Sequence, residues 1–187
     1  VPRLHWTTDN QLVVSRLNRR QDTLELLLVL RSRVLYDDED NTSWLPVRPL
    51  LRETDQAYVE IHDNLVFLKD GSRFLWTSEQ NGFNHLYLYG LDGKMERPLT
   101  SGNFDVTSFY GIDESTGKFY YQTATSTPLD RQVWEGNLNG ADPRLLTPLP
   151  GTSEAAFSPA FNYFTLSWSD ANTPPVVTLR NRAGEVV

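Results

Sequence analysis

Apolar and polar residues alternate along most of this chain, in short runs that end at turn-forming residues. In HLYLY (85–89), leucines alternate with aromatic residues, and alternation with period two places one side of a strand against a core. Asp92-Gly93 and Asn139-Gly140 follow such runs, and these dipeptides accept positive φ at both positions of a tight hairpin turn. No stretch keeps a helical period, so the pattern predicts an all-β fold.

The same succession of strands and turns recurs with a period of about 45 residues. The matching segments are RFLWTSEQ (73–80) with KFYYQTAT (118–125), HLYLYGLDG (85–93) with QVWEGNLNG (132–140), and RPLT (97–100) with RLLT (144–147). A third copy begins at FTLSWSDANTP (164–174), and a looser copy lies in QLVVSRLNRRQDTLELLLVL (11–30). The chain is therefore built from one repeated β unit.

Four-stranded β units that repeat every 40–50 residues or so are typical of propeller blades. We expect a β-propeller fragment of roughly three to four four-stranded antiparallel blades, forming a single partial domain over residues 1–187. A β-sandwich is the alternative, whereas a β-helix would need a much shorter repeat. We expect an incomplete ring with exposed edge strands, belonging to a larger protein. The expected blades are 5–50, 58–108, 109–155 and an incomplete one at 156–187.

The composition of the chain disfavours several classes of function. The 187 residues are 39% hydrophobic and 22% charged, which is ordinary for a soluble domain with a core. Seventeen basic and 24 acidic residues give a net charge of −7, which disfavours nucleic-acid binding. Cysteine is absent, which excludes disulfides and thiolate metal sites. The most apolar stretch, LELLLVL (24–30), is far shorter than the roughly 20 residues of a membrane helix, so we expect no membrane insertion.

Motifs for known catalytic chemistry are missing from this sequence. It contains no G-x-S-x-G nucleophile elbow, no H-E-x-x-H zinc pair and no glycine-rich phosphate loop. Glu60, Glu79 and Asp105 are candidate glycosidase carboxylates, but nothing in the sequence pairs them. We therefore expect no catalytic residue, no metal and no cofactor in this chain.

Several conspicuous residues have a structural interpretation as well as a functional one. The acidic run DDEDN (37–41) could gather calcium, but it lacks the spacing of an EF-hand and is better explained as a solvated loop. His85 begins an alternating strand, where we expect it to hydrogen-bond across the blade. We expect packing between blades to explain most of the aromatic residues that could otherwise form a sugar or peptide platform, namely Trp76, Phe109, Tyr120, Tyr121, Trp134 and Trp168.

Four segments, in uninterrupted order, carry a resemblance to one known family. They are WTTDNQLVVSRLNRRQDTLELLLV (6–29), with its Leu17-Asn18-Arg19 and Gln21; FLKDGSRFLWTSEQNGFNHLYLY (67–89); LTSGNFDVTSFYGID (99–113), with the aromatic Phe104; and 118–135, with Pro128 and Arg131. Together they resemble the N-terminal propeller domain of the dipeptidyl peptidase IV family of prolyl-oligopeptidase-type serine peptidases, in its bacterial version. The resemblance covers essentially the whole chain.

This resemblance implies an eight-bladed propeller followed by an α/β-hydrolase domain, in an enzyme that removes N-terminal X-Pro or X-Ala dipeptides. The catalytic Ser, Asp and His, and the glutamate pair that binds the substrate amino terminus, have no counterpart in this chain. By position before the F-x-x-D-G strand, Glu60, Ile61 and His62 correspond to part of the extended substrate-binding pocket, although the family motif is not preserved there.

The expected function is therefore to gate and orient peptide substrates for the chain's own α/β-hydrolase domain. The resemblance also implies a periplasmic, cell-envelope or secreted protein and a possible homodimer, although no signal peptide opens this chain. Two alternatives stay open. One is a non-catalytic periplasmic scaffold that binds partner proteins, and the other is a sugar-processing propeller.

Overall fold

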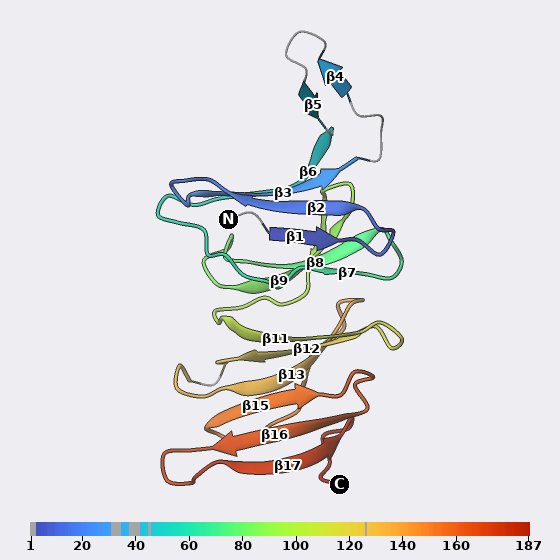
Figure 1. Ribbon diagram of the computed structural model, residues 1–187. Helices are drawn as coiled ribbons and strands as arrows, with labels where there is room; N and C mark the ends of the chain where they lie inside the picture. The colour runs from blue at the N-terminus through green and yellow to red at the C-terminus, as the bar shows by residue number, and fades with distance from the viewer. Residues whose placement is uncertain (1–2, 31–34, 38–41, 45, 126) are drawn as a thin grey trace. The chain divides into compact units, whose positions relative to one another are not determined.

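The computed structural model describes residues 3–30, 35–37, 42–44, 46–125 and 127–187, which form antiparallel β-sheets and contain no helix (Figure 1). The first four-stranded sheet has the order β1 (Arg3–Trp6), β2 (Leu12–Leu17), β3 (Thr23–Val29), β6 (Val47–Thr54). The second has the order β10 (Met95–Pro98), β9 (His85–Gly90), β8 (Arg73–Ser78), β7 (Val66–Phe67). The third has the order β11 (Val106–Asp113), β12 (Lys118–Thr123), β13 (Gln132–Asn137), β14 (Arg144–Leu145).

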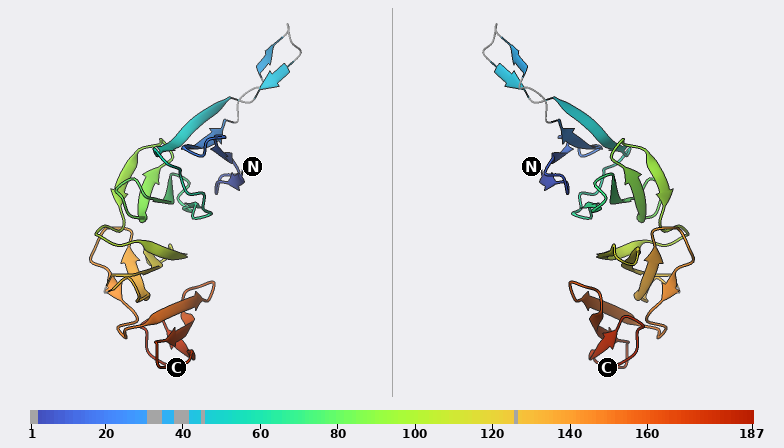
Figure 2. Two further views of the ribbon diagram at one scale, coloured as in Figure 1. Left: turned by 90° about the vertical axis from the view of Figure 1, so that its left-hand side faces the viewer. Right: turned by 90° about the vertical axis from the view of Figure 1, so that its right-hand side faces the viewer.

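A three-stranded sheet and a small hairpin complete the described strands. The sheet contains β15 (Thr152–Phe157), β16 (Tyr163–Ser169) and β17 (Val176–Asn181), and the hairpin contains β4 (Leu35–Asp37) and β5 (Thr42–Trp44). The chain divides into two compact units, Val1–Trp76 with Tyr89–Glu96, and Thr77–Leu88 with Arg97–Val187. The larger sheets twist, as two side views show (Figure 2).

The sheets confirm the predicted all-β propeller fragment and give a structural meaning to its sequence repeat. The first two pairs of matched segments begin at the first residues of equivalent strands, β8 with β12 and β9 with β13. The third pair begins at Arg97, inside β10, and at Arg144, the first residue of β14. The sequence repeat aligns three strands of each blade. A fourth strand, β7 or β11, precedes each aligned set and completes the blade.

Glycine turns join the last two strands of successive blades. Gly93 and Gly140 have φ of 87° and 81°, and each donates its N–H to the carbonyl three residues earlier. The preceding Asp92 and Asn139 do not have positive φ, so the expectation of positive φ at both positions was wrong. The glycine is the fourth residue of each turn, where a left-handed conformation returns the chain to the sheet.

The repeated Leu-Thr element satisfies buried backbone groups. The Thr100 hydroxyl accepts the N–H of Leu86 at 3.0 Å, and the Thr147 hydroxyl accepts the N–H of Val133 at 2.8 Å. Both threonine side chains are buried. Because a buried N–H without a partner is costly, the hydroxyl completes the strand's hydrogen bonding beside a short fourth strand.

Arginines in the fourth strands contact the glycine-turn region of the following blade. They begin the related sequences RPLL (48–51), RPLT (97–100) and RLLT (144–147). Their guanidinium groups donate to backbone carbonyls, from Arg48 to Leu91 at 2.6 Å, from Arg97 to Asn139 at 2.8 Å, and from Arg144 to Ala183 at 3.1 Å. The repeat therefore encodes contacts between successive blades as well as the strands within them.

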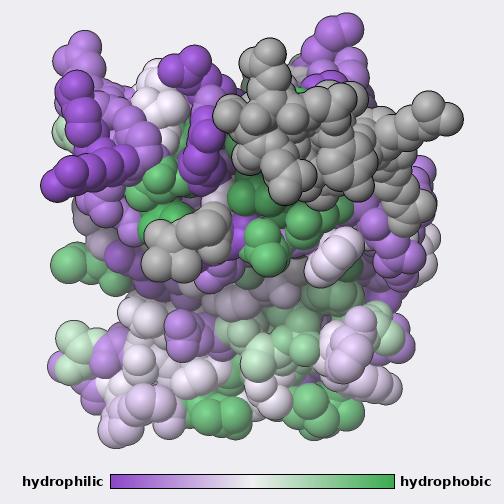
Figure 3. All heavy atoms as spheres, turned by 45° about the horizontal axis from the view of Figure 1, so that its top comes forward, coloured by the Kyte–Doolittle hydropathy of each residue, from purple (hydrophilic) through white to green (hydrophobic). Residues whose placement is uncertain are grey.

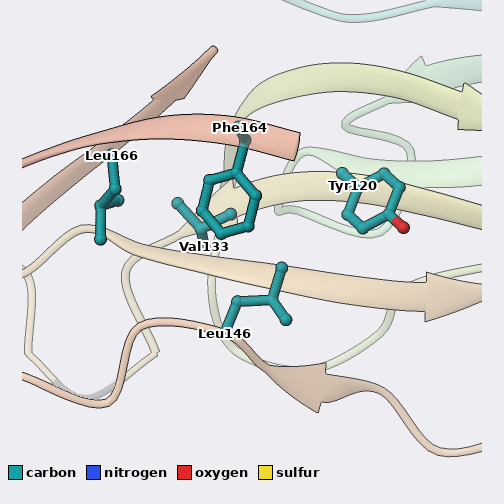
Figure 4. Close-up of a cluster of buried hydrophobic side chains, with 5 residues drawn as sticks. All are labelled: Tyr120, Val133, Leu146, Phe164 and Leu166. Atoms are coloured by element: carbon teal, nitrogen blue, oxygen red, sulfur yellow. The ribbon is translucent and has the colours of Figure 1, made fainter. Parts of the chain in front are cut away.

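Aromatic and aliphatic side chains fill the space between neighbouring sheets of the second unit. Tyr120 and Val133 face Phe164 and Leu166 of β16, and Leu146 closes the cluster (Figure 4). A second cluster includes Tyr121, with Phe109 and Trp134 packed against it. Trp76 is also buried, in the first unit. The prediction that packing explains most of the aromatic residues is confirmed for Trp76, Phe109, Tyr120, Tyr121 and Trp134, whereas Trp168 is half-buried.

Glu135 is a charged group inside this packing. Its side chain is 4% exposed and accepts hydrogen bonds from Lys118 at 2.6 Å and Arg144 at 3.0 Å. Burial alone would raise the pKa of Glu135, but the two cationic donors outweigh it and hold that pKa below its ordinary value of 4.5.

Replacing Thr147 with valine tests the role of the Leu-Thr element. The change keeps the side-chain shape but leaves the buried N–H of Val133 without its acceptor, so we expect a loss of about 1–3 kcal/mol in the free energy of unfolding. Urea unfolding measures this loss. Thr165→Val, at an exposed position of β16, is the matched control and should change stability by less than about 0.5 kcal/mol. Equal effects of the two variants would contradict the assigned role.

The lowered pKa of Glu135 predicts that the free energy of unfolding falls in acid. Its folded-state pKa lies below the unfolded value of about 4.5, so the stabilisation is present above that pH and is lost as pH falls through the lower folded pKa. We expect the unfolding free energy of Glu135→Gln to fall less steeply than that of the wild type below about pH 4.5. Unfolding curves across pH 2–7 check this. Parallel pH profiles would show that Glu135 does not contribute.

Candidate functional site

The three residues assigned to substrate contact lie on the connection between β6 and β7, in the first unit. Glu60 is exposed, whereas Ile61 and His62 are half-buried. The connection, residues 55–65, contains no regular strand, so its conformation depends on contacts with its surroundings. These contacts decide which side chains remain available to a ligand.

Two backbone hydrogen bonds attach the beginning of this connection to the turn between β2 and β3. The N–H of Asp55 donates to the carbonyl of Asp22 at 3.1 Å, and the N–H of Val59 donates to the carbonyl of Gln21 at 2.7 Å. Gln21 has a positive φ of 61°, an uncommon conformation for a residue with a side chain. The connection is therefore held directly before Glu60.

The His62 ring holds the part of the segment that follows Glu60. Its centroid is 4.2 Å from the ring of Trp76, with 45° between the ring planes. Trp76 is 2% exposed and donates its indole N–H to Glu53 at 2.9 Å, so it provides a firm surface. The His62 Nδ1 accepts the N–H of Asn64 at 3.2 Å. His62 is thus an anchor of the segment, whereas Glu60 is exposed to solvent.

An ion pair attaches the 55–65 connection to β1 more weakly. Arg3 of β1 pairs with Asp63, whose side chain is 77% exposed, and exposed pairs contribute only about 0.2–1 kcal/mol. Burial lowers the pKa of the neighbouring His5, against the opposing effect of Asp63, and Arg3 lowers it further. Sequence reasoning gave Arg3 no role and expected only packing for Trp76, because their partners here are distant along the chain. An arginine and a tryptophan in strands give no local signal of such a role.

Two of the remaining candidate residues, His85 and Asp105, serve the fold. His85 is buried, with Nδ1 3.1 Å from the Thr100 hydroxyl and Nε2 3.0 Å from the carbonyl of Gly102, which confirms the predicted bonding across the blade. Asp105 accepts the N–H of Asn84 at 2.7 Å, so this candidate carboxylate supports a loop. Glu79 is exposed. Asp105 and Glu79 thus show no built sugar site.

No metal site is apparent in the described part of the chain, where no three His, Asp or Glu residues gather closely enough to bind an ion. Of the acidic run DDEDN (37–41), positions 38–41 lie outside the described residues. The described residues also include no helix long and apolar enough to cross a membrane. Some large apolar side chains, such as Trp6 and Leu129, are largely exposed. Apolar residues (green) lie among polar ones (purple) on the face drawn in Figure 3, as on most folded proteins.

A cavity of about 260 Å³ lies in the second unit, between residues 147–149 and the β15–β17 sheet. Leu166, Trp168 and Val176 give it a largely apolar lining. Trp168 donates its indole N–H to the carbonyl of Pro150 at 2.9 Å, so its polar atom is already engaged. The cavity has no convergent set of acid, base and nucleophile, and we do not assign chemistry to it.

Comparison with known proteins gives consistent matches. The family model described as the dipeptidyl peptidase IV (DPP IV) N-terminal region matches residues 1–175. "Dipeptidyl peptidase 4" of Arthroderma otae is 32% identical over 84% of this chain and 20% of that protein. "Inactive dipeptidyl peptidase 10" of Mus musculus is 29% identical over 93% of this chain and 22% of that protein.

Solved structures agree with the sequence matches. The crystal structure of Porphyromonas gingivalis dipeptidyl peptidase 4 aligns with a TM-score of 0.76 and 33% identity, over 97% of this chain and 24% of that one. A putative dipeptidyl aminopeptidase IV from Bacteroides ovatus aligns with the same TM-score at 22% identity, which supports the fold alone. The chain thus spans about a fifth to a quarter of the length of these proteins.

Hydrogen exchange can test whether His62 anchors the 55–65 segment. In His62→Ala the contact with Trp76 is lost, so we expect amides of residues 58–64 to exchange roughly tenfold faster, while β8 and β9 keep their protection. Mass spectrometry of peptides from this region measures the change. Tyr58→Ala removes an aromatic side chain that is 59% exposed in the same segment, and it should leave exchange unchanged. Unaltered exchange in His62→Ala would contradict the anchoring role.

Proposed function

This chain belongs to the dipeptidyl peptidase IV N-terminal region family, and from this we propose that it is the non-catalytic propeller portion of a dipeptidyl-peptidase-like serine peptidase. In this proposal, the propeller gates and orients peptides for a separate α/β-hydrolase domain that removes N-terminal X-Pro or X-Ala dipeptides. The family match across residues 1–175 is the observation that carries the proposal.

The chemistry of the described residues supports a role in orientation. His85 and Thr100 form a histidine–hydroxyl pair, but both are buried, and the hydroxyl already accepts the N–H of Leu86. Such a pair cannot present a nucleophile to a peptide. A propeller can still accelerate cleavage, because holding a substrate near its reactive geometry removes motional freedom before the reaction. It also excludes folded proteins by size.

A second candidate is a non-catalytic scaffold that binds partner proteins in the periplasm. Similarity to a protein named "Inactive dipeptidyl peptidase 10" supports keeping it, since that name describes a relative without activity. For either function we propose homodimerisation and export to the periplasm, to the cell envelope or out of the cell. Cell fractionation and analytical ultracentrifugation test these two proposals, and a cytosolic monomer would contradict both.

Turnover of chromogenic Gly-Pro and Ala-Pro substrates distinguishes the two functions. We expect the full-length protein to cleave them, and the 187-residue chain alone to give no rate above buffer, because its sequence contains no G-x-S-x-G nucleophile elbow. The control is the full-length protein with the serine of its G-x-S-x-G elbow replaced by alanine.

Cleavage by the isolated chain that survives repurification would overturn the assignment of catalysis to another domain. A full-length protein that lacks the elbow and cleaves neither substrate would favour the scaffold.

A further inference from the structure

We propose that the cavity between residues 147–149 and the β15–β17 sheet binds a small aromatic carboxylate, with its ring beside Leu166 and Trp168 and its carboxylate at the Arg180 guanidinium. The inference goes beyond the proposed function and does not rest on it, because binding can be measured with or without peptide cleavage. It follows from the way the walls of this cavity differ from the corresponding positions of the preceding blade.

Strand pairing relates the cavity walls to positions in the preceding β11–β14 blade. Residues 121 and 123 are the fourth and sixth of β12, as residues 166 and 168 are of β16. The corresponding pairs are Tyr121–Trp134 with Leu166–Thr178, and Thr123–Val106 with Trp168–Ser153. From the earlier blade to the later one, leucine thus replaces tyrosine, threonine replaces tryptophan and serine replaces valine. Among these four positions, only Trp168 is larger than its counterpart.

The connections that precede the two blades differ in the same direction. Phe104, four residues after Thr100, packs against the hydrophobic cluster that contains Val106. Gly151, four residues after Thr147, has no side chain to place there. The cavity therefore lies where one aromatic side chain and parts of three others are missing. Since the corresponding walls pack against aromatic rings in the preceding blade, an aromatic ring is the occupant that fits this space.

The volume and the lining of the cavity suit one ring with a short side chain. Its volume is about 260 Å³, whereas an engineered apolar cavity of about 150 Å³ is enough to bind benzene. Leu166 is buried, but Leu149 is 50% exposed and Val176 is 47% exposed, so the cavity meets solvent beside these two residues. A ligand can therefore enter without the sheet having to open.

Two polar groups of the lining determine the charge that the ligand should carry. The Arg180 guanidinium donates to the Thr178 hydroxyl at 3.2 Å and to the carbonyl of Gly184 at 2.8 Å, but no carboxylate pairs with it in the part of the chain that the structure describes. The hydroxyl of the buried Ser153 has no hydrogen-bond partner among the same residues. A guanidinium with N–H groups to spare binds a carboxylate through charge-assisted hydrogen bonds, and Ser153 supplies one more donor.

The test is a titration of the full-length protein with phenylacetate, followed by ligand-observed nuclear magnetic resonance. Phenylacetamide has the same ring without the charge, and acetate has the charge without the ring. We expect phenylacetate to bind with a Kd on the order of 0.1–1 mM, as suits so small a ligand. Phenylacetamide and acetate should each bind at least roughly tenfold more weakly, because each lacks one of the two contacts.

Variants of the cavity lining locate the bound ligand. Arg180→Gln should weaken phenylacetate binding roughly tenfold and leave phenylacetamide binding unchanged. Arg19→Gln removes an exposed arginine from the other unit, so this matched control should change neither. Thr178→Trp introduces the residue that the preceding blade has at this position, and it should abolish binding by filling the cavity. Leu166→Tyr fills the same space from β16 and repeats the test if Thr178→Trp lowers the melting temperature.

Three results would overturn the inference. Undiminished phenylacetate binding in a filled variant that keeps the wild-type melting temperature would place the ligand elsewhere. Equal affinities for phenylacetate and acetate would show only an anion contact at the surface. No binding of phenylacetate to the full-length protein would show that another part of that protein covers the cavity. None of these results bears on the cleavage of X-Pro peptides, so the proposed function stands or fails by its own test.

Discussion

Burial of middle strands in the second and third sheets on both faces is the constraint on which much of this structure depends. All residues of β9 are buried, as are five of the six in β8 and in β12. Polar groups in these strands must therefore find partners inside the protein. The Thr100 and Thr147 hydroxyls complete the backbone bonding, and Lys118 and Arg144 neutralise Glu135. The Leu-Thr element recurs in the sequence because its threonine hydroxyls meet this requirement.

The same constraint explains where function can reside. Side chains in the middle strands are occupied by packing and hydrogen bonds, as His85 shows, so they are not free to meet a substrate. Connections between strands can meet one, provided that the sheets hold them. The 55–65 connection satisfies both conditions, since Glu60 is exposed between attachments to Gln21 and Trp76.

Much of the fold could be predicted because its signals are local and repeated. The alternation in HLYLY (85–89) locates β9, and its match at 132–140 locates β13. The Asp92-Gly93 dipeptide located a turn correctly. Its detailed geometry was predicted wrongly, because a dipeptide indicates which residues tolerate positive φ without showing which of them takes it.

The sequence by itself determined the repeated unit, the places of its strands and turns, and the family of the chain. Tertiary structure decided which residues of the candidate site are anchors and which one is exposed. His62, on the connection between β6 and β7, contacts Trp76 of β8, and Arg3 pairs with Asp63, 60 positions away along the chain. Such contacts depend on how separate segments come together in space, which no local pattern of apolar and polar residues specifies. For this reason Glu60 and His62, two positions apart in the sequence, have different roles.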